Sequence, residues 1–110
     1  MGKALLMVRA ELADTVDRLA FDRWYETEHL PDALEVFQAE RAWRCWSETE
    51  PSLHYAFYEF VGVEAARTAV QSAGMRTLIG EFDRAWDTRV RRTRDILHVV
   101  HAVPAKAAES

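Results

Sequence analysis

The chain has 110 residues, of which 49% are hydrophobic and 29% are charged, a composition that predicts one folded domain and excludes a disordered protein. The formal net charge is -4 and the basic residues are dispersed among 18 acidic ones, which excludes an electrostatic nucleic-acid binder. The single cysteine excludes an intrachain disulfide and a cysteine metal cluster. No apolar run approaches the ~20 residues of a membrane helix, so we expect a cytoplasmic protein.

The first two elements are predicted to be a strand and a helix. Residues 3–12 begin with the apolar run "ALLMV" and then alternate between charged and apolar side chains, which favours a strand. Acidic N-cap candidates follow at Asp14 and Asp17. Apolar residues then recur at helical spacing, so a helix is expected to run as far as Pro31 and to stop there.

A β-hairpin is expected next. Residues 39–48 place tryptophans between small or polar residues, "ETEPS" has turn composition, and the aromatic run "LHYAFYEFV" over residues 53–61 favours a second strand. A turn centred on Glu50 and Pro51 would join the two strands. Alternate residues of a strand point to opposite faces, so the register of this hairpin decides which side chains face the helices.

With that turn, Arg44 and Trp46 share a face with Glu59, and Arg44 can pair with Glu59 within the sheet. Cys45 lies on the other face, where a cysteine between two tryptophans is expected to be buried and inert. A shift of one residue in the register exchanges the two faces.

Two helices and a last strand complete the chain. Alanine-rich periodicity predicts a helix over residues 63–74 that closes at a glycine, and a further helical stretch follows over residues 75–92. The apolar segment "DILHVVHAV" over residues 95–103 predicts the final strand. One domain is therefore expected over residues 1–103, with a flexible C-terminal tail over residues 104–110.

The order of these elements predicts an α+β fold of the ferredoxin-like βαββαβ type, a four-stranded antiparallel sheet with helices on one face. A sheet covered on one side should alternate between apolar and polar residues, yet "ALLMV" and "YAFYEF" are apolar or aromatic at both parities. A second copy of the chain is the simplest cover for the other face, so a homodimer through the sheet faces is expected.

With "WYETEHLP" at the end of its first helix, the chain resembles the dimeric α+β barrel superfamily, and within it the EthD-like proteins and their relatives. The matching positions are Trp24, Tyr25, His29, Leu30 and Pro31. The resemblance implies a small-molecule cleft in each subunit between helices and sheet, with His29 directed toward it. It also implies chemistry without a cofactor, as in the polyketide cyclases and isomerases of the superfamily; quinone-forming monooxygenases and haem-degrading enzymes belong to it as well.

The helical spacing places Phe21, Tyr25 and His29 on one stripe, with Glu28 beside it. A neutral imidazole can take and return a proton, which enolisation, aldol closure and double-bond migration all require, so His29 is the candidate acid/base group. Tyr25 is the candidate hydrogen-bond donor to a developing oxyanion. The alternative for His29 is a structural role, with its cation favoured by the C-terminal end of the helix.

Further candidates for the pocket walls are aromatic. Trp24, Trp46, Tyr58, Trp86 and His98, together with Phe21 and Glu28, are expected to bind the substrate; for the aromatic ones, packing of the core or of the dimer is the alternative. The four histidines have no short ligand spacing, which argues against a metal site.

These residues suggest a cofactor-independent cyclase, isomerase or dehydratase acting on an apolar, aromatic or polyketide-like compound. Two alternatives stay open: a cofactor-independent monooxygenase of quinol-like substrates, and a ligand-binding or stress-associated dimer without catalysis. The same cleft serves all three.

Overall fold

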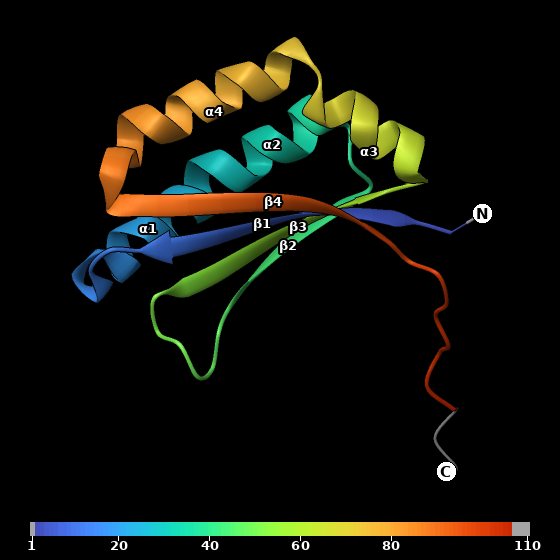
Figure 1. Cartoon of the computed structure of the whole chain (residues 1–110), viewed down its shortest axis with the longest axis horizontal. Coiled ribbons are helices and arrows are strands. Elements are labelled where there is room, and N and C mark those ends of the chain that lie inside the picture. Colours follow the sequence, from blue (N-terminus) through green and yellow to red (C-terminus); the bar gives the residue numbers. More distant parts are fainter. Residues whose placement is uncertain (1, 107–110) are drawn as a thin grey trace.

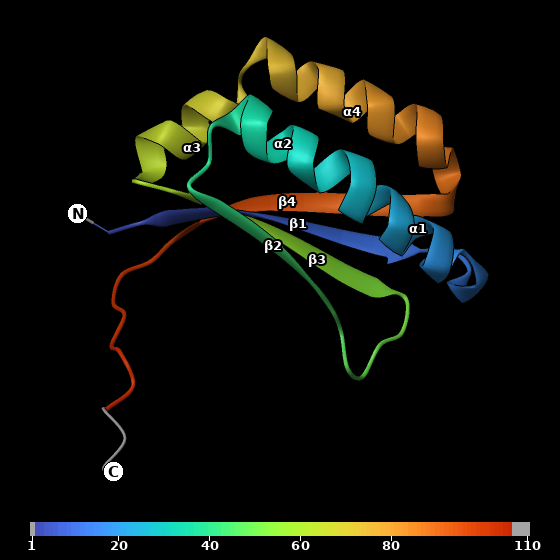
Figure 2. The same cartoon turned by 180° about the vertical axis from the view of Figure 1, so that it is seen from behind.

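The computed structural model describes residues 2–106, which form the expected ferredoxin-like α+β fold. Four strands make one antiparallel sheet in the order β2-β3-β1-β4, and the helices cover one of its faces, as the two opposite views show (Figure 1, Figure 2). The elements are β1 Ala4–Leu12, α1 Arg18–Trp24, α2 Leu30–Phe37, β2 Arg41–Trp46, β3 Leu53–Phe60, α3 Val63–Val70, α4 Ala73–Trp86 and β4 Val90–His98.

Strand β1 carries the centre of the core. Its alternate side chains from Ala4 to Leu12 are buried beneath the helices, and those between them are only half-buried on the open face. Strand β3 shows the same alternation, with Ala56, Tyr58 and Phe60 buried on the helix side. Burial of each large apolar side chain stabilises the fold by roughly 1.5–3 kcal/mol, so this one face holds the two layers together.

The prediction that the first helix stops at Pro31 is wrong. A single π-helical turn over Tyr25–His29 joins α1 directly to α2, and Pro31 lies in the first turn of α2. The helix ends instead at Gln38, whose φ of 53° is left-handed. A proline cannot donate a backbone hydrogen bond, and the wider turn before it absorbs that loss without breaking the helix.

The later helices are also shorter than predicted. Helix α3 ends at Val70, Ser72 caps α4 by accepting a hydrogen bond from the Met75 backbone N–H, and Gly74 lies inside α4 instead of closing α3. Helix α4 ends at Trp86, where the predicted helix continued to residue 92.

Strand β4 accordingly begins at Val90 and ends at His98, where a strand over residues 95–103 was predicted. Arg91 and Arg92, which fall inside the predicted helix, are therefore strand residues, as is Arg94. Pairing along β1 holds them there, because Arg92 lies opposite Ala10 and Arg94 opposite Val8.

The hairpin takes the alternative register. Arg44 lies opposite Ala56, and Trp46 lies opposite His54, so both side chains face the helices. The predicted Arg44–Glu59 pair is wrong, since Glu59 pairs with Arg41 at 3.2 Å on the open face. Cys45 is exposed on that face, not buried as expected.

The open face of the sheet carries a group of apolar side chains, as predicted, beside charged residues such as the Arg41–Glu59 pair. Met7, Trp43, Tyr55 and Phe57 lie on it half-buried, and the rings of Trp43 and Phe57 stack with their centroids 5.6 Å apart. No helix within residues 2–106 has the length and apolarity needed to cross a bilayer. The domain limits stay a prediction, and residues 107–110 of the predicted tail lie outside the described residues.

Candidate functional site

His29 is placed by the π-helical turn in the first helix. The Leu30 N–H donates to the Tyr25 carbonyl five residues back, which is the defining hydrogen bond of a π turn. Within this turn Tyr25 and His29 are buried, while the three residues between them are exposed. The turn therefore directs one phenol and one imidazole inward at the point where a proline follows. Such π turns often occur at functional sites.

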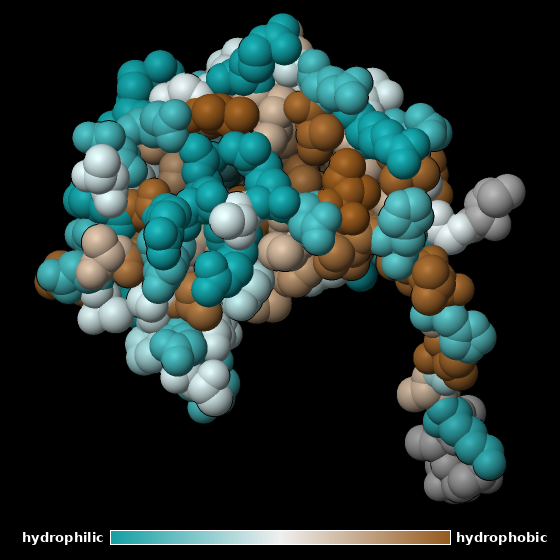
Figure 3. Space-filling view, in the orientation of Figure 1, coloured by the Kyte–Doolittle hydropathy of each residue, from teal (hydrophilic) through white to brown (hydrophobic). Residues whose placement is uncertain are grey.

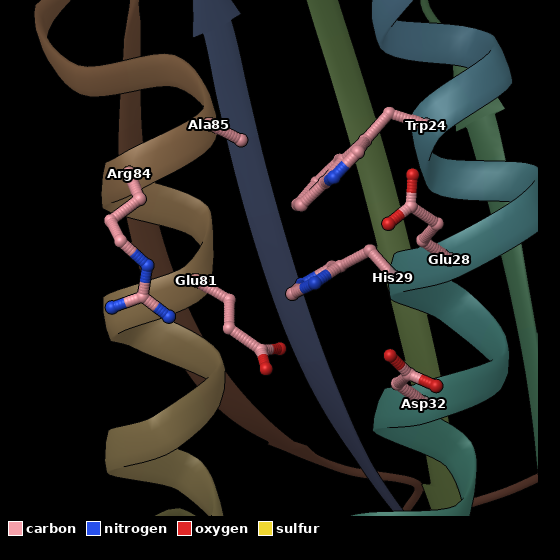
Figure 4. Close-up of a pocket in the computed structure, with 7 residues that line it drawn as sticks. All are labelled: Trp24, Glu28, His29, Asp32, Glu81, Arg84 and Ala85. Carbon is pink, nitrogen blue, oxygen red and sulfur yellow. The ribbon is translucent and has the colours of Figure 1, made fainter.

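The His29 ring lies in a groove between two antiparallel helical segments (Figure 4). Trp24 and His29 point from the first segment toward α4 with nearly parallel rings, their centroids 4.6 Å apart and their planes inclined by 16°. Glu81 points into the same space from α4. The groove has a volume of about 350 Å³. It is lined by Trp24, Glu28, His29, Asp32, Glu81, Arg84 and Ala85.

The lining of this groove is polar and acidic, with three carboxylates and one guanidinium around the two rings. This differs from the apolar pocket that the resemblance implies. Carboxylates near an imidazole favour its protonated form, and the face of the Trp24 indole does the same through a cation–π interaction. Here burial and the Arg92 charge outweigh any such effect, so the site favours a neutral imidazole.

In the resting protein His29 is neutral. Only 8% of the residue is exposed, and this burial, with a smaller contribution from the nearby Arg92 charge, lowers the pKa of His29 to about 4. At neutral pH the imidazole therefore carries a proton on only one ring nitrogen, and the other nitrogen can accept a proton. His29 also borders a narrow crevice on its inner side, which is lined by Tyr58, Arg92 and Arg94 among others.

Tyr25 packs against the His29 ring inside the core and does not line the groove. Its ring meets that of His29 edge to face with centroids 4.9 Å apart, and its hydroxyl is hydrogen-bonded to the Tyr58 hydroxyl. Burial raises the pKa of Tyr25 to about 12 and that of Tyr58 well above its ordinary value, so both phenols keep their protons. Of the two, Tyr58 is the one that borders the inner crevice.

A second polar cluster lies on the sheet beneath Tyr25, and the sequence patterns did not reveal it. The Arg44 guanidinium donates to Asp22 Oδ1 at 2.5 Å and lies 3.3 Å from His54 Nε2, while Trp46 Nε1 donates to Asp22 Oδ1 at 2.9 Å. Only the hairpin register brings these groups together. Because the predicted register places Arg44 on the open face, away from the helices, it does not bring Arg44 near Asp22.

Burial shapes the charges of this cluster. His54 has no exposed surface, and this burial, with the adjacent Arg44 charge, lowers the pKa of His54 to about 3. Partial burial alone would raise the pKa of Asp22, but hydrogen bonds from Trp46 and Arg44 outweigh it and lower that pKa. His54 Nδ1 has no hydrogen-bond partner within the described residues, so its neutral ring is held by packing and by Arg44.

The remaining predicted site residues lie in three places. Phe21 is fully buried between the Trp46, Trp86 and His54 rings, and Trp86 is buried with the Arg89 guanidinium 4.7 Å from its ring centroid. Both support the Trp24 ring from behind. His98 is exposed at the end of β4 and borders a separate hollow near the N-terminal residues. No group of three or more metal-ligating side chains is arranged to hold an ion within residues 2–106.

No protein-family model matches the chain, and no curated protein matches it significantly. Solved structures do match. A variant of SnoaB from Streptomyces nogalater, described as a cofactor-independent oxygenase, has a TM-score of 0.65 and 11% identity over 94% of this chain and 99% of the other.

Two further structures are similar. A Bacillus halodurans protein of the ethyl tert-butyl ether D (EthD) family has a TM-score of 0.61 and 13% identity over 86% of this chain and 97% of its own. A dimeric ferredoxin-like protein from an uncultured marine organism has a TM-score of 0.57 and 15% identity over 94% of this chain and 100% of its own. Identities this low show the shared ferredoxin-like fold, and the chemistry has to be argued from the residues.

Proposed function

We propose that the chain is a small-molecule enzyme that performs cofactor-independent acid/base chemistry, with His29 as the proton acceptor. One observation carries the proposal: a neutral, buried imidazole lies between an open groove on one side and an internal crevice on the other. A substrate in either space meets the same ring. The similar structures include enzymes, which supports an enzymatic role without choosing the reaction.

The low pKa of His29 limits the kinds of substrate from which it can remove a proton. Proton transfer is efficient when the pKa values of donor and acceptor are close, so a weak base requires a substrate whose proton is already acidic. Protons between two carbonyl groups, or on a phenol, are the most acidic that polyketide-like and quinol-like compounds carry. Their pKa values still exceed that of His29, so the site must also stabilise the anion that forms. Cyclisation, isomerisation and dehydration of such compounds all begin with this proton transfer.

The neighbouring residues take supporting parts in the proposal. Tyr25 positions the His29 ring and accepts a hydrogen bond from Tyr58, whose hydroxyl borders the crevice and can donate to an oxyanion there only by giving up that bond. Trp24 and Glu28 form a wall of the groove, with the Trp24 ring stacked on that of His29. Phe21, Trp46 and Trp86 hold these rings from below, and His98 belongs to a different surface.

A cofactor-independent monooxygenase is the second candidate, favoured by the stacked rings of Trp24 and His29 beside a phenol-lined crevice. In this reaction a deprotonated quinol-like substrate is oxidised by O₂, and His29 again removes the proton. Oxygen uptake that accompanies substrate loss separates the two candidates. Binding without any product supports the third hypothesis, a dimer that binds a ligand without catalysis.

Replacement of His29 tests the proposal. Purified protein is incubated with a panel of electron-rich phenols and 1,3-dicarbonyl compounds, and product is followed by mass spectrometry with an oxygen electrode in parallel. For a compound that turns over, His29→Gln should lower the rate by roughly 10²–10⁴-fold, the usual contribution of general base catalysis.

The control is His101→Gln, which replaces an exposed histidine outside the secondary structure and should leave the rate unchanged. The profile of kcat/KM against pH should rise through a pKa of about 4, the value for His29. A folded His29→Gln protein with an unchanged rate would contradict the assignment.

We also propose that the chain forms a homodimer through the open face of the sheet. Trp43, Tyr55 and Phe57 remain half-buried there in a single chain, and one of the similar structures is itself a dimeric ferredoxin-like protein. Sedimentation at micromolar concentration should find a dimer that Phe57→Glu dissociates, whereas Val16→Glu, at a site 77% exposed in the chain, should not. A stable monomer of the unmodified chain would exclude this interface.

A further inference from the structure

A second hollow lies at the β4 edge of the molecule, distinct from the groove of Figure 4. It has a volume of about 470 Å³, within the usual range for small-molecule sites. Brown apolar surface gathers where α3 and the start of α4 face β4, with teal hydrophilic surface beside it (Figure 3). The hollow is lined by Leu6, Val70, Met75, Ile79, Arg94, Asp95 and Ile96.

The hollow continues toward His29. The narrow crevice that borders His29 and Tyr58 shares four lining residues with it: Leu6, Met75, Ile79 and Arg94. The crevice itself has room for only about 20 Å³, which is the space of one water-sized group. The body of a ligand therefore fits the hollow, and only a slim end of it can approach the imidazole.

Two arginine side chains border this hollow or the crevice that continues from it. Arg92 and Arg94 both lie on the helix side of β4, and Arg92 is paired with Asp83 at 2.8 Å over the ring of Phe82. Arg94 is exposed, and its guanidinium has no ion pair or hydrogen bond with any of residues 2–106. The two guanidinium charges repel, and the Arg94 charge contributes to lowering the pKa of Arg92 after burial.

Asp95 also borders the hollow, but it forms no ion pair with Arg94 within residues 2–106. Successive residues of a strand point to opposite faces, and Asp95 lies opposite Met7 on the open side of the sheet. Apart from Asp95, the hollow combines aliphatic walls with one cation that has no ion pair within residues 2–106, and an apolar molecule bearing a single negative group would complement both features.

We propose that this hollow binds an amphipathic carboxylate, with its carboxylate on Arg94 and its apolar body against Leu6, Ile79 and Ile96. The binding stands on its own geometry, and it rests on the proposed function only in identifying this compound as the substrate presented to His29. The substrate class would then be apolar carboxylic acids whose far end carries the acidic proton.

The test uses two probes that differ only in charge, decanoate and decan-1-ol, titrated calorimetrically into the full chain at neutral pH. The unmodified protein should bind decanoate at least ten-fold more tightly than the alcohol. Arg94→Gln should remove this preference without changing the affinity for the alcohol. Arg91→Gln is the matched control, because Arg91 lies on the same strand, is 83% exposed at its side chain and is paired with Glu11 on the opposite face.

The location is checked by NMR. Decanoate should shift the methyl signals of Ile79 and Ile96, whereas shifts confined to Trp43 and Phe57 would place it on the open face and overturn the proposal. Equal affinities for the two probes, no binding of either at millimolar concentration, or an unaltered preference in Arg94→Gln would also overturn it. Binding needs no turnover, so decanoate bound on Arg94 by a chain that fails the His29 test would leave this inference standing while the enzymatic proposal falls.

Discussion

Acidification from pH 7.5 to 5 is expected to destabilise the folded chain through two buried histidines. Burial, assisted by Arg92 for His29 and by Arg44 for His54, lowers the pKa of His29 to about 4 and that of His54 to about 3, from an ordinary 6.5. An unfolded imidazole takes up a proton below about pH 6.5, whereas both folded rings stay neutral down to about pH 4. Their contribution to stability is therefore complete above pH 6.5 and is lost as the pH falls toward 4.

The magnitude follows from proton linkage. Each histidine should cost about 2 kcal/mol of unfolding free energy between pH 7.5 and 5, and the pair about 4 kcal/mol. A typical domain is stable by only ~5–15 kcal/mol, so this loss is a large share of the total. Asp22 does not contribute in this window, because its lowered pKa places its titration below an ordinary value of 3.8.

Urea unfolding followed by tryptophan fluorescence measures the effect at several pH values, with the protein concentration held constant because dimerisation also affects stability. His29→Gln and His54→Gln should each reduce the loss over this interval to about 2 kcal/mol, whatever their effect at pH 7.5. The exposed His101→Gln serves as control and should behave as the parent does. A parent whose stability is flat over this range, or glutamine variants that keep the full loss, would refute the reasoning.

Two further substitutions compare a part-buried interaction with a more exposed one. Arg44→Met should cost about 2–3 kcal/mol in urea unfolding because it leaves Asp22 without its main partner, whereas Arg41→Met, which breaks an exposed pair, should cost under about 1 kcal/mol. Gly80→Ala should stabilise α4 by about 0.5–1 kcal/mol, since the added methyl meets only ordinary contacts. At Gly74 the added Cβ would lie 2.4 Å from a valine of α2, so Gly74→Ala should lower the melting temperature; an increase equal to that of Gly80→Ala would contradict this close helix contact.

The sequence by itself determined the order and type of the elements, because apolar periodicity reflects which face of each segment is buried. The apolar and aromatic runs in residues 3–12 and 53–61 identified two strands with apolar side chains on both faces, and "WYETEHLP" identified the helix that carries His29. Patterns of this kind depend only on residues close together in the sequence, so they can be recognised without knowing the tertiary structure.

Tertiary structure decided the features that local rules cannot reach. Pro31 predicts a helix end, but burial of the Tyr25 and His29 rings on one side and of Phe37 further along favours one continuous helix with a π turn. Likewise the hairpin register depends on pairing along its whole length. A shift of one residue placed Arg44 beneath the helices instead of on the open face.

The environment of the candidate site was also decided by tertiary structure. The type of residue at position 29 is local information, but its pKa depends on burial and on Arg92 from a strand that begins 61 residues later. The apolar hollow beside Arg94 is built from β1, α3, α4 and β4. Side chains can be assigned to a face from their periodicity, whereas the charge and space they share depend on distances that only the packed fold defines.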